Sequence, residues 1–362
     1  MLGTFYGKND TRRDRGFTIL YVGTNTGGLL GPIVYGFIYQ TVNWHTAFLT
    51  SFIILALWLL TYLKLNRYLD AKYQMQSQKN IFSFYYKNTI YFILSIITLL
   101  IVFILLEHTK FVGYLLDTTG LITLFMFLGY AASKKEERKN ILLLILMIAI
   151  TLLFFACELQ TNSSLIIFTQ DYIKRNYLNI TIPASVFASL EPGFVIISSL
   201  ALLKVWEKLQ NKELGELTKL IIGLFLAAAA FAILTLTVEV IMISNHTASI
   251  GWIIAAYLLL GAGESCIIPP LLAAITHRAP SNARGTFMGG LYLALAFSGY
   301  LAGKIAELTS RTFHQGHVNL SHIGYEVAPF FAVFQQICYL MLGIALILAL
   351  INMGCYMYRK IL

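Results

Sequence analysis

The sequence predicts an all-α integral membrane protein with about ten transmembrane helices. Of its 362 residues, 58% are hydrophobic and only 12% are charged, whereas a soluble domain carries about 25% charged residues. This small number of charges cannot cover a water-exposed surface. Lipid must therefore surround much of the chain. The aromatic content of 14% suits helix ends that lie at membrane interfaces.

The apolar runs have the length that a membrane requires. A helix rises about 1.5 Å per residue, so about 20 apolar residues cross the hydrocarbon core. Lipid offers no partners to backbone polar groups, and the sequence lacks the alternation of a β-barrel, so each run is predicted to be a helix. In chain order, the spans are expected near residues 17–40, 45–63, 89–106, 112–132, 141–168, 184–203, 220–243, 250–276, 285–309 and 328–357.

The lysine and arginine residues are concentrated in alternate loops. All 26 of them except Lys110, Lys174, Arg175, Lys304 and Arg311 lie in the N-terminal segment, in every second connection or at the C-terminal end. Cytoplasmic loops carry an excess of basic residues, so an even number of spans and two cytoplasmic termini are expected. The net charge of +9 forms no continuous basic stripe, so no nucleic-acid partner is expected.

Other kinds of site find little support in the sequence. His314, His317 and His322 fall in a polar loop without a cysteine or carboxylate cluster, so a solvated loop is favoured over a metal site. Gly261-Ala-Gly263 lies in an apolar span and predicts close helix packing, not dinucleotide binding. We expect no metal and no cofactor, and no nucleophile–base pair indicates an enzyme.

Three glutamates lie inside predicted spans, where a charge is costly. Pro269 and Pro270 follow Glu264 and are expected to break its helix and open the backbone, so a functional role is favoured there. Glu158 precedes a polar stretch that could line a cavity, and functional and structural roles remain equally open. Glu239 lies close to the outer end of its span, where it can reach water, so a structural role is favoured. A carboxyl group in a low-dielectric cavity can exchange a proton near neutral pH, which would permit proton coupling.

Four sequence motifs recur in one known family. They are RRDRGFTILYVGTNTG at residues 12–27, IPASVFASLEP at 182–192, GESCIIP at 263–269 and the stretch 284–303. They resemble the fifth, eighth, tenth and eleventh helices of the proton-dependent oligopeptide transporter (POT) family, a branch of the major facilitator superfamily. The resemblance covers nearly the whole chain and implies a major-facilitator-type helical bundle. The two spans between 89 and 132 resemble the extra helix pair of bacterial members.

The resemblance also implies roles for individual residues. Asn25 would contact a peptide substrate, and Glu264 would bind the amino end of the peptide and take part in proton coupling. Position 191 also faces the peptide in the family and is usually Asn, but here it is Glu191. A family Trp on the eleventh helix corresponds to Leu291, which would alter one wall of the pocket.

The seventh helix of the family often carries a Glu-Gln pair. Aligning Gln160, Ser163 and Ser164 with the family places Leu159 on the glutamate position, one residue after Glu158. One residue is about 100° around a helix, so Glu158 is shifted from the expected direction. We include Gln160, Ser163 and Ser164 among the expected substrate-binding residues, and Glu158 with Glu264 as the proton-coupling residues.

The expected function is proton-coupled uptake of di- and tripeptides across the cytoplasmic membrane. The resemblance implies four further helices ahead of residue 1, so we expect an N-terminally shortened chain. Its parts would be a remnant of the N-terminal bundle (1–66), an inserted helix pair (67–139) and a C-terminal six-helix bundle (140–362). The expected partners are a small peptide, a proton, lipid and the missing N-terminal helices. A degenerate fragment, or a binding or scaffold subunit that does not transport, remains open because alternating access needs two bundles.

Overall fold

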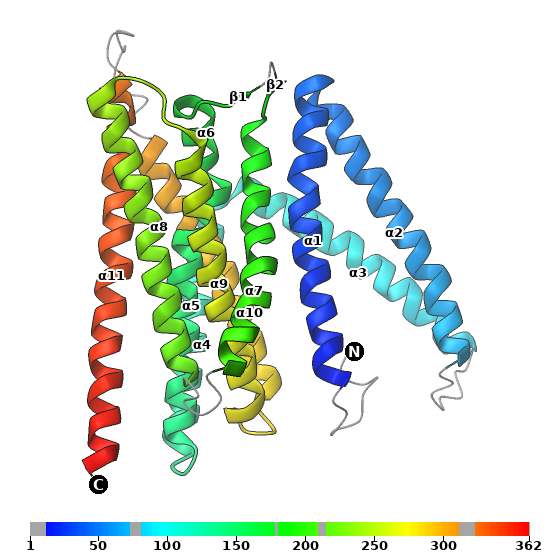
Figure 1. Cartoon of the computed structure of the whole chain (residues 1–362). Coiled ribbons are helices and arrows are strands. Elements are labelled where there is room, and N and C mark those ends of the chain that lie inside the picture. Colours follow the sequence, from blue (N-terminus) through cyan, green and yellow to red (C-terminus); the bar gives the residue numbers. More distant parts are fainter. Residues whose placement is uncertain (1–11, 73–80, 178–179, 209–214, 311–322, 362) are drawn as a thin grey trace.

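The computed structural model describes residues 12–72, 81–177, 180–208, 215–310 and 323–361 (Figure 1). Long helices make up most of these ranges. The elements in chain order are α1 (Arg12–Thr41), α2 (Trp44–Lys72), α3 (Ile81–Glu107), α4 (Thr109–Ser133), α5 (Arg138–Glu158), η2 (Leu159–Asn162), α6 (Ser164–Tyr172), β1 (Asn176–Tyr177), β2 (Ile180–Thr181), η3 (Ala184–Ser189), α7 (Leu190–Lys208), α8 (Glu216–Ser244), α9 (Ile250–Arg278), α10 (Arg284–Ser310) and α11 (Ile323–Ile361). The histidines considered for a metal site, at 314, 317 and 322, lie outside the described residues.

All the predicted spans except 141–168 lie in continuous helical segments of the structure, and the helices extend past most of the predicted ends. Within the described residues, eight helical segments are long and apolar enough to cross a membrane. They are α2, α4, α5 with α6, η3 with α7, α8, α9, α10 and α11. The prediction of an all-α membrane protein is therefore confirmed.

The core lies between α5 and the helices α7 to α11, and glycines set its closest contacts. A Cβ atom on Gly223 of α8 would lie 2.8 Å from the carbonyl oxygen of Gly263 on α9. A Cβ atom on Gly261 would lie 2.9 Å from the backbone nitrogen of Val195 on α7. The backbone of α9 thus approaches two neighbours, and the predicted packing role of Gly261-Ala-Gly263 is confirmed.

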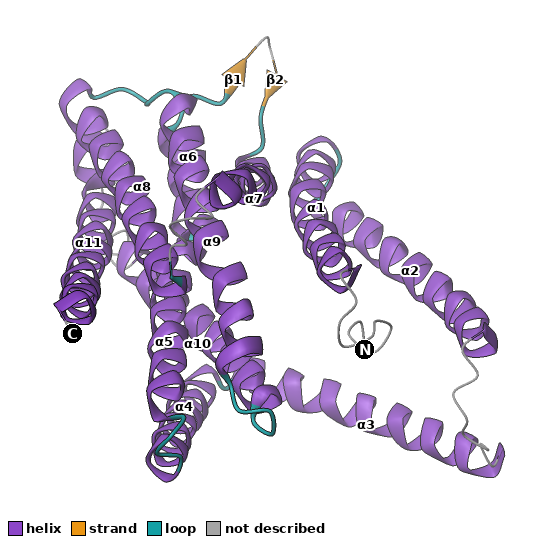
Figure 2. Ribbon diagram, turned by 60° about the horizontal axis from the view of Figure 1, so that its bottom comes forward, coloured by secondary structure: helices purple, strands orange, loops and turns teal. Residues whose placement is uncertain are grey.

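The first helices lie beside this core (Figures 1 and 2). α1 packs against η3 and α7, whereas α2 buries only Ala47 of its apolar span Trp44–Leu65. α4 packs against α5 and α10, where Phe127 stacks on Phe287 with 4.7 Å between ring centroids. The expected division of the chain near residues 66 and 139 stays a prediction.

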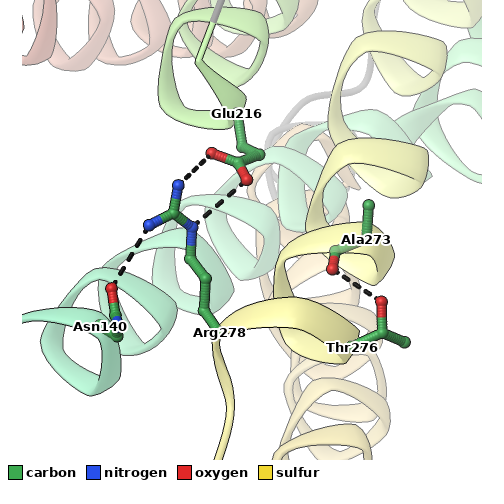
Figure 3. A network of polar contacts seen from close by, with 5 residues as sticks. All are labelled: Asn140, Glu216, Ala273, Thr276 and Arg278. Atoms are coloured by element: carbon green, nitrogen blue, oxygen red, sulfur yellow. Dashed lines mark hydrogen bonds and ion pairs between the residues drawn. The ribbon is translucent and has the colours of Figure 1, made fainter. Parts of the chain in front are cut away.

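A polar network ties the helices together at the end where α8 begins and α9 ends (Figure 3). Arg278 places Nη2 2.8 Å from Oε2 of Glu216, and its Nε donates to Oε1 of the same carboxylate at 3.3 Å. The Nη1 atom of Arg278 donates to Asn140 on α5 at 3.3 Å. In the same turn of α8, the Thr218 hydroxyl accepts a hydrogen bond from Asn352 on α11 at 3.0 Å. Four helices therefore meet at the first turn of α8.

The helix break lies in a different place from the one predicted. α9 continues across Pro269 and Pro270, so the break expected after Glu264 is wrong. Each proline removes one backbone donor, but packing against α7 and α8 holds the remaining turns of α9 in the helix. The span predicted at 141–168 is interrupted instead, by the 3₁₀ turn η2 between Glu158 and Ser164.

Candidate substrate and proton site

Glu158 lies where the regular helix α5 ends. The tighter turn η2 follows directly, and Ser163 (φ −133°, ψ −96°) redirects the chain into α6. The Glu158 side chain is only 2% exposed. Non-helical backbone at membrane depth is tolerated where protein or a water-filled cavity surrounds it. The break thus brings polar groups together inside the bundle.

Thr161 of η2 connects three helices. Its Oγ1 atom lies 3.3 Å from Oε1 of Glu158 and 3.2 Å from Oε2 of Glu191 on α7. Its carbonyl oxygen accepts a hydrogen bond of 3.1 Å from the hydroxyl of Tyr257 on α9. A threonine hydroxyl has one proton and can donate it to only one carboxylate. The second carboxyl group must therefore donate to Thr161 for both contacts to be hydrogen bonds.

Three glutamates from α5, α7 and α9 form one cluster. Thr161 bridges Glu158 and Glu191, and Glu191 lies close to Glu264. Glu158 and Glu191 are buried, and Glu264 is partly buried. Ionised carboxylates only accept hydrogen bonds and repel one another at short range, so neighbouring carboxyl groups favour a shared proton. Among the described residues, no lysine or arginine forms an ion pair with these three glutamates. Glu158 and Glu264 thus lie in one cluster of carboxyl groups, and their proton-coupling role stays a prediction.

The polar residues that follow Glu158 turn toward α10. Gln160 is 1% exposed, and its Nε2 atom donates to the carbonyl oxygen of Ala302 at 3.0 Å. The Oε1 atom of Gln160 accepts from Ser164 at 2.9 Å and from Ser163 at 3.4 Å. The Ser164 hydroxyl also lies 3.1 Å from that of Thr309 on α10. These side chains join η2 and α6 to α10 in this conformation, and their substrate-binding role stays a prediction.

Asn25 lies on α1, near the contact between α1 and α7. It is half-buried and precedes Gly28 by three residues, so the two share a helix face. A Cβ atom on Gly28 would lie 2.9 Å from Cγ of Pro192, the residue after Glu191. Asn25 is therefore placed on the side of α1 that faces α7, and its contact with a peptide stays a prediction.

Two further residues that lie at the site were not predicted from the sequence. Thr161 lies within the polar stretch after Glu158, but nothing in the sequence distinguishes it from its neighbours. Tyr257 precedes Glu264 by seven residues, which is two helical turns, so helical periodicity alone could have placed both on one face of α9. Glu239 is exposed near the end of α8, as expected for a glutamate that reaches the interface. Leu291 is 1% exposed and belongs to the hydrophobic core.

Comparison with known proteins shows which family this chain resembles. The POT family model matches residues 1–320. The peptide transporter YePEPT of Yersinia enterocolitica is 27% identical over 326 residues, which are 84% of this chain and 63% of the relative. The dipeptide and tripeptide permease A of Escherichia coli is 26% identical over 313 residues, which are 84% of this chain and 61% of the relative. The chain thus spans less than two thirds of the length of these two relatives.

Solved structures share the fold. The crystal structure of the peptide transporter POT in complex with sulfate has a TM-score of 0.72 at 21% identity, covering 97% of this chain and 70% of that chain. A POT family transporter in complex with a thioalcohol-conjugated peptide has a TM-score of 0.71 at 22% identity, covering 96% and 72%. The match of the family model across most of the sequence, on a bundle of membrane-spanning length, shows that this chain is a multi-pass membrane protein of the POT family.

Proposed function

We propose that this chain serves proton-coupled uptake of di- and tripeptides across the cytoplasmic membrane, as a secondary active transporter. The observation that carries the proposal is the cluster of Glu158, Glu191 and Glu264 at a helix break inside the bundle. Acidic groups are expensive within a membrane and usually mark a path for protons or solutes. A purely structural contact between α5, α7 and α9 would not require three of them.

The cluster offers a way to couple the peptide to the proton. One ionised carboxylate, assigned to Glu264 by resemblance, would pair with the amino group of the peptide. Glu158 would carry the proton, and Glu191 would link the two by its contacts with both. When the peptide and the proton are both bound, the site carries less net charge than the empty, ionised site. Enclosing a site of smaller net charge away from water costs less free energy. Loading with both ligands would therefore favour the closed states through which transport proceeds.

The relatives support a small substrate with an amino group. Two curated relatives are named for peptides or for di- and tripeptides. Other POT family structures hold a thioalcohol-conjugated peptide or 5-aminolevulinic acid. Asn25, Gln160, Ser163 and Ser164 would supply polar contacts to such a substrate. The same proposal includes a partner: this chain would pair with helices equivalent to the part of the relatives that it does not match.

The arrangement of the helix ends supports the proposed orientation. The last turn of α7 and the last turn of α9 carry Lys208 and Arg278, and the connection from α4 to α5 carries Lys134 and Lys135. These ends lie at one end of the bundle, together with the end of α11 (Figure 1). By the positive-inside rule this end would face the cytoplasm, with both termini.

Uptake by proteoliposomes tests the proposal. The full chain should accumulate a labelled dipeptide when an inward proton gradient is applied, and not without it. Glu264→Gln should lower the uptake at least about tenfold, because losing one partner of a buried charge pair costs about 2 kcal/mol or more. Glu239→Gln, at the exposed glutamate, is the matched control and should leave uptake unchanged. Peptide binding without uptake by the native chain would contradict the proposal and support a subunit that does not transport.

A further inference from the structure

α4 packs along α10 at two glycines, one on each helix (Figure 2). A Cβ atom on Gly290 of α10 would lie 2.5 Å from Cζ of Phe127 on α4. Nearer the start of α4, a Cβ atom on Gly113 would lie 2.6 Å from the hydroxyl oxygen of Tyr300 on α10. The helices run in opposite directions, because the start of α4 meets the second half of α10. Gly113 and Tyr300 thus form a close seam between α4 and α10.

Three charged side chains lie at this seam. Lys304 follows Tyr300 by one turn of α10, and its Nζ atom lies 4.9 Å from the centre of the Tyr300 ring. Asp117, one turn after Gly113 on α4, and Glu307 on α10 lie close to Lys304. All three charged side chains are exposed. Within the part of the chain that the structure describes, Lys304 forms no ion pair, so opposite charges lie near each other at the seam without being joined.

These charges lie within helices that are long and apolar enough to cross a membrane. Asp117 is eight residues from the start of α4 and Lys304 is six residues from the end of α10, which corresponds to about 12 Å and 9 Å along the helices. A charge that faces hydrocarbon is costly and needs a partner. Lysine can extend its charge toward the membrane surface, but the shorter aspartate reaches less far. A partner supplied by the lipid would remove part of this cost.

An apolar strip continues from Asp117 toward the middle of α4. Leu121 and Phe125 follow Asp117 by about one and two turns, so they share its helix face. Their side chains are 55% and 68% exposed. A polar group at the outer part of a helix, with exposed apolar side chains beneath it, matches the division of a phospholipid into headgroup and acyl chain.

We propose that the seam at Asp117 and Lys304 binds the headgroup of one phosphatidylethanolamine molecule. The ammonium of the headgroup donates hydrogen bonds to the Asp117 carboxylate, and Glu307 adds to its attraction. The phosphate accepts hydrogen bonds from the Lys304 ammonium, which the Tyr300 ring helps to hold in place. An acyl chain lies along Leu121 and Phe125. By the orientation proposed above, the lipid belongs to the outer leaflet.

The charges at the seam select this headgroup among common phospholipids. Phosphatidylglycerol carries the phosphate but no cation, so it leaves Asp117 without a partner. Phosphatidylcholine carries a cation whose nitrogen is fully methylated and has no N–H to donate to a carboxylate. Only a headgroup with both a phosphate and an N–H-bearing ammonium satisfies Asp117 and Lys304 together.

Lipid binding by the purified full chain tests the site. The chain in detergent is titrated with phosphatidylethanolamine, and the bound lipids are counted by native mass spectrometry. The native chain should retain one phosphatidylethanolamine at a lower lipid concentration than it needs for phosphatidylglycerol or phosphatidylcholine. Lys304→Gln and Asp117→Asn should each weaken this retention at least about fivefold, because each removes a hydrogen bond to a charged group.

Matched controls remove the same charges elsewhere. Lys174→Gln and Glu239→Gln change exposed residues outside the seam and should retain the lipid as the native chain does. Equal retention by the native chain and the two seam variants overturns the site. Equal affinity of the native chain for phosphatidylethanolamine and phosphatidylcholine overturns the pairing of the ammonium with Asp117. Displacement of the lipid by co-expressed partner helices would show that the seam is a protein contact, which also overturns the proposal.

A charge reversal covers the case in which the two seam variants lose the lipid because they misfold. Asp117→Lys places a second ammonium close to Lys304, so the seam should lose phosphatidylethanolamine and gain affinity for phosphatidylglycerol. Unfolding cannot produce such a gain. An unchanged preference for phosphatidylethanolamine in Asp117→Lys contradicts the proposal. None of these measurements depends on uptake, so the lipid site and the proposed function can fail separately.

Discussion

The Thr161 side chain lies beside the glutamate cluster, and its hydroxyl contacts two of the carboxyl groups. Thr161→Val keeps the shape of the side chain and removes the hydroxyl between Glu158 and Glu191. Because these groups are buried, the free energy of unfolding in detergent should fall by about 1–3 kcal/mol. Thr237→Val is the matched control: this buried hydroxyl donates to Ile233 of its own helix, and its loss should cost less. Equal losses in chemical denaturation would contradict the bridging role of Thr161.

The members of the cluster could be predicted individually, but their contact could not. Glu158 and Glu264 stand out because acids are costly in apolar runs, and Glu191 because it replaces an Asn in a motif that resembles the POT family. Their meeting depends on how three distant helices pack, which no local pattern specifies. Gln160 shows the same limit at closer range. Its polarity marks it as a site residue, but the direction of the 3₁₀ turn points its amide at Ala302 of α10.

At the scale of the helix, the α8–α9 contact depends on the absence of a side chain. Gly223→Ala would place a Cβ atom 2.8 Å from the Gly263 carbonyl oxygen and 2.7 Å from Cγ1 of Ile267. Because the carbonyl belongs to the backbone, the helices must separate, and the free energy of unfolding should fall by about 1–3 kcal/mol. Gly343→Ala on α11, where a Cβ atom would meet nothing within 4 Å, should leave stability unchanged or slightly higher. Thermal unfolding of both variants in detergent measures this difference. Equal stability of the two variants would contradict the prediction.

The Arg278 network lets the strength of a tie between helices be measured. Arg278 and Glu216 are 34% and 27% exposed, so solvent weakens their attraction. A double-mutant cycle with Arg278→Ala and Glu216→Ala should give a coupling energy of about 0.5–1 kcal/mol. Asn140→Ala should lower stability less, because it removes one hydrogen bond of 3.3 Å. A coupling energy of zero would mean that the two-bond geometry in Figure 3 does not hold α8 to α9.

Helix breaks were harder to predict than helices. Apolar length predicted where helical segments lie, because the membrane fixes the number of residues in a crossing. The proline pair at 269 and 270 indicated a break that the buried helix α9 does not have. The actual interruption, at residues 159–163, contains no proline or glycine. Its polar side chains and the carbonyl of Thr161 find partners on other helices, and those partners are a property of the packed bundle.

On the scale of the whole molecule, the chain divides into a well-packed bundle and helices at its side. The residues from α5 to α11 supply most of the buried core, whereas α2 buries only Ala47 of its apolar span. Hydropathy treats these helices alike, because lipid and protein neighbours are equally apolar. The sequence therefore predicted the spans but not which of them lie at the periphery.

The number of crossings between two loops can be tested directly by labelling. Between Lys135 and Asn176 we expect a single crossing, because α5, η2 and α6 together form one apolar segment of membrane-spanning length. Both residues are exposed. A membrane-impermeant maleimide should therefore label Lys135→Cys only in inverted vesicles and Asn176→Cys only in intact cells, with the native chain as the blank for its own cysteines. Labelling of both positions from the same side would mean that the chain turns back at the break near Glu158, and the glutamate cluster would then lie near one surface of the membrane instead of between the two.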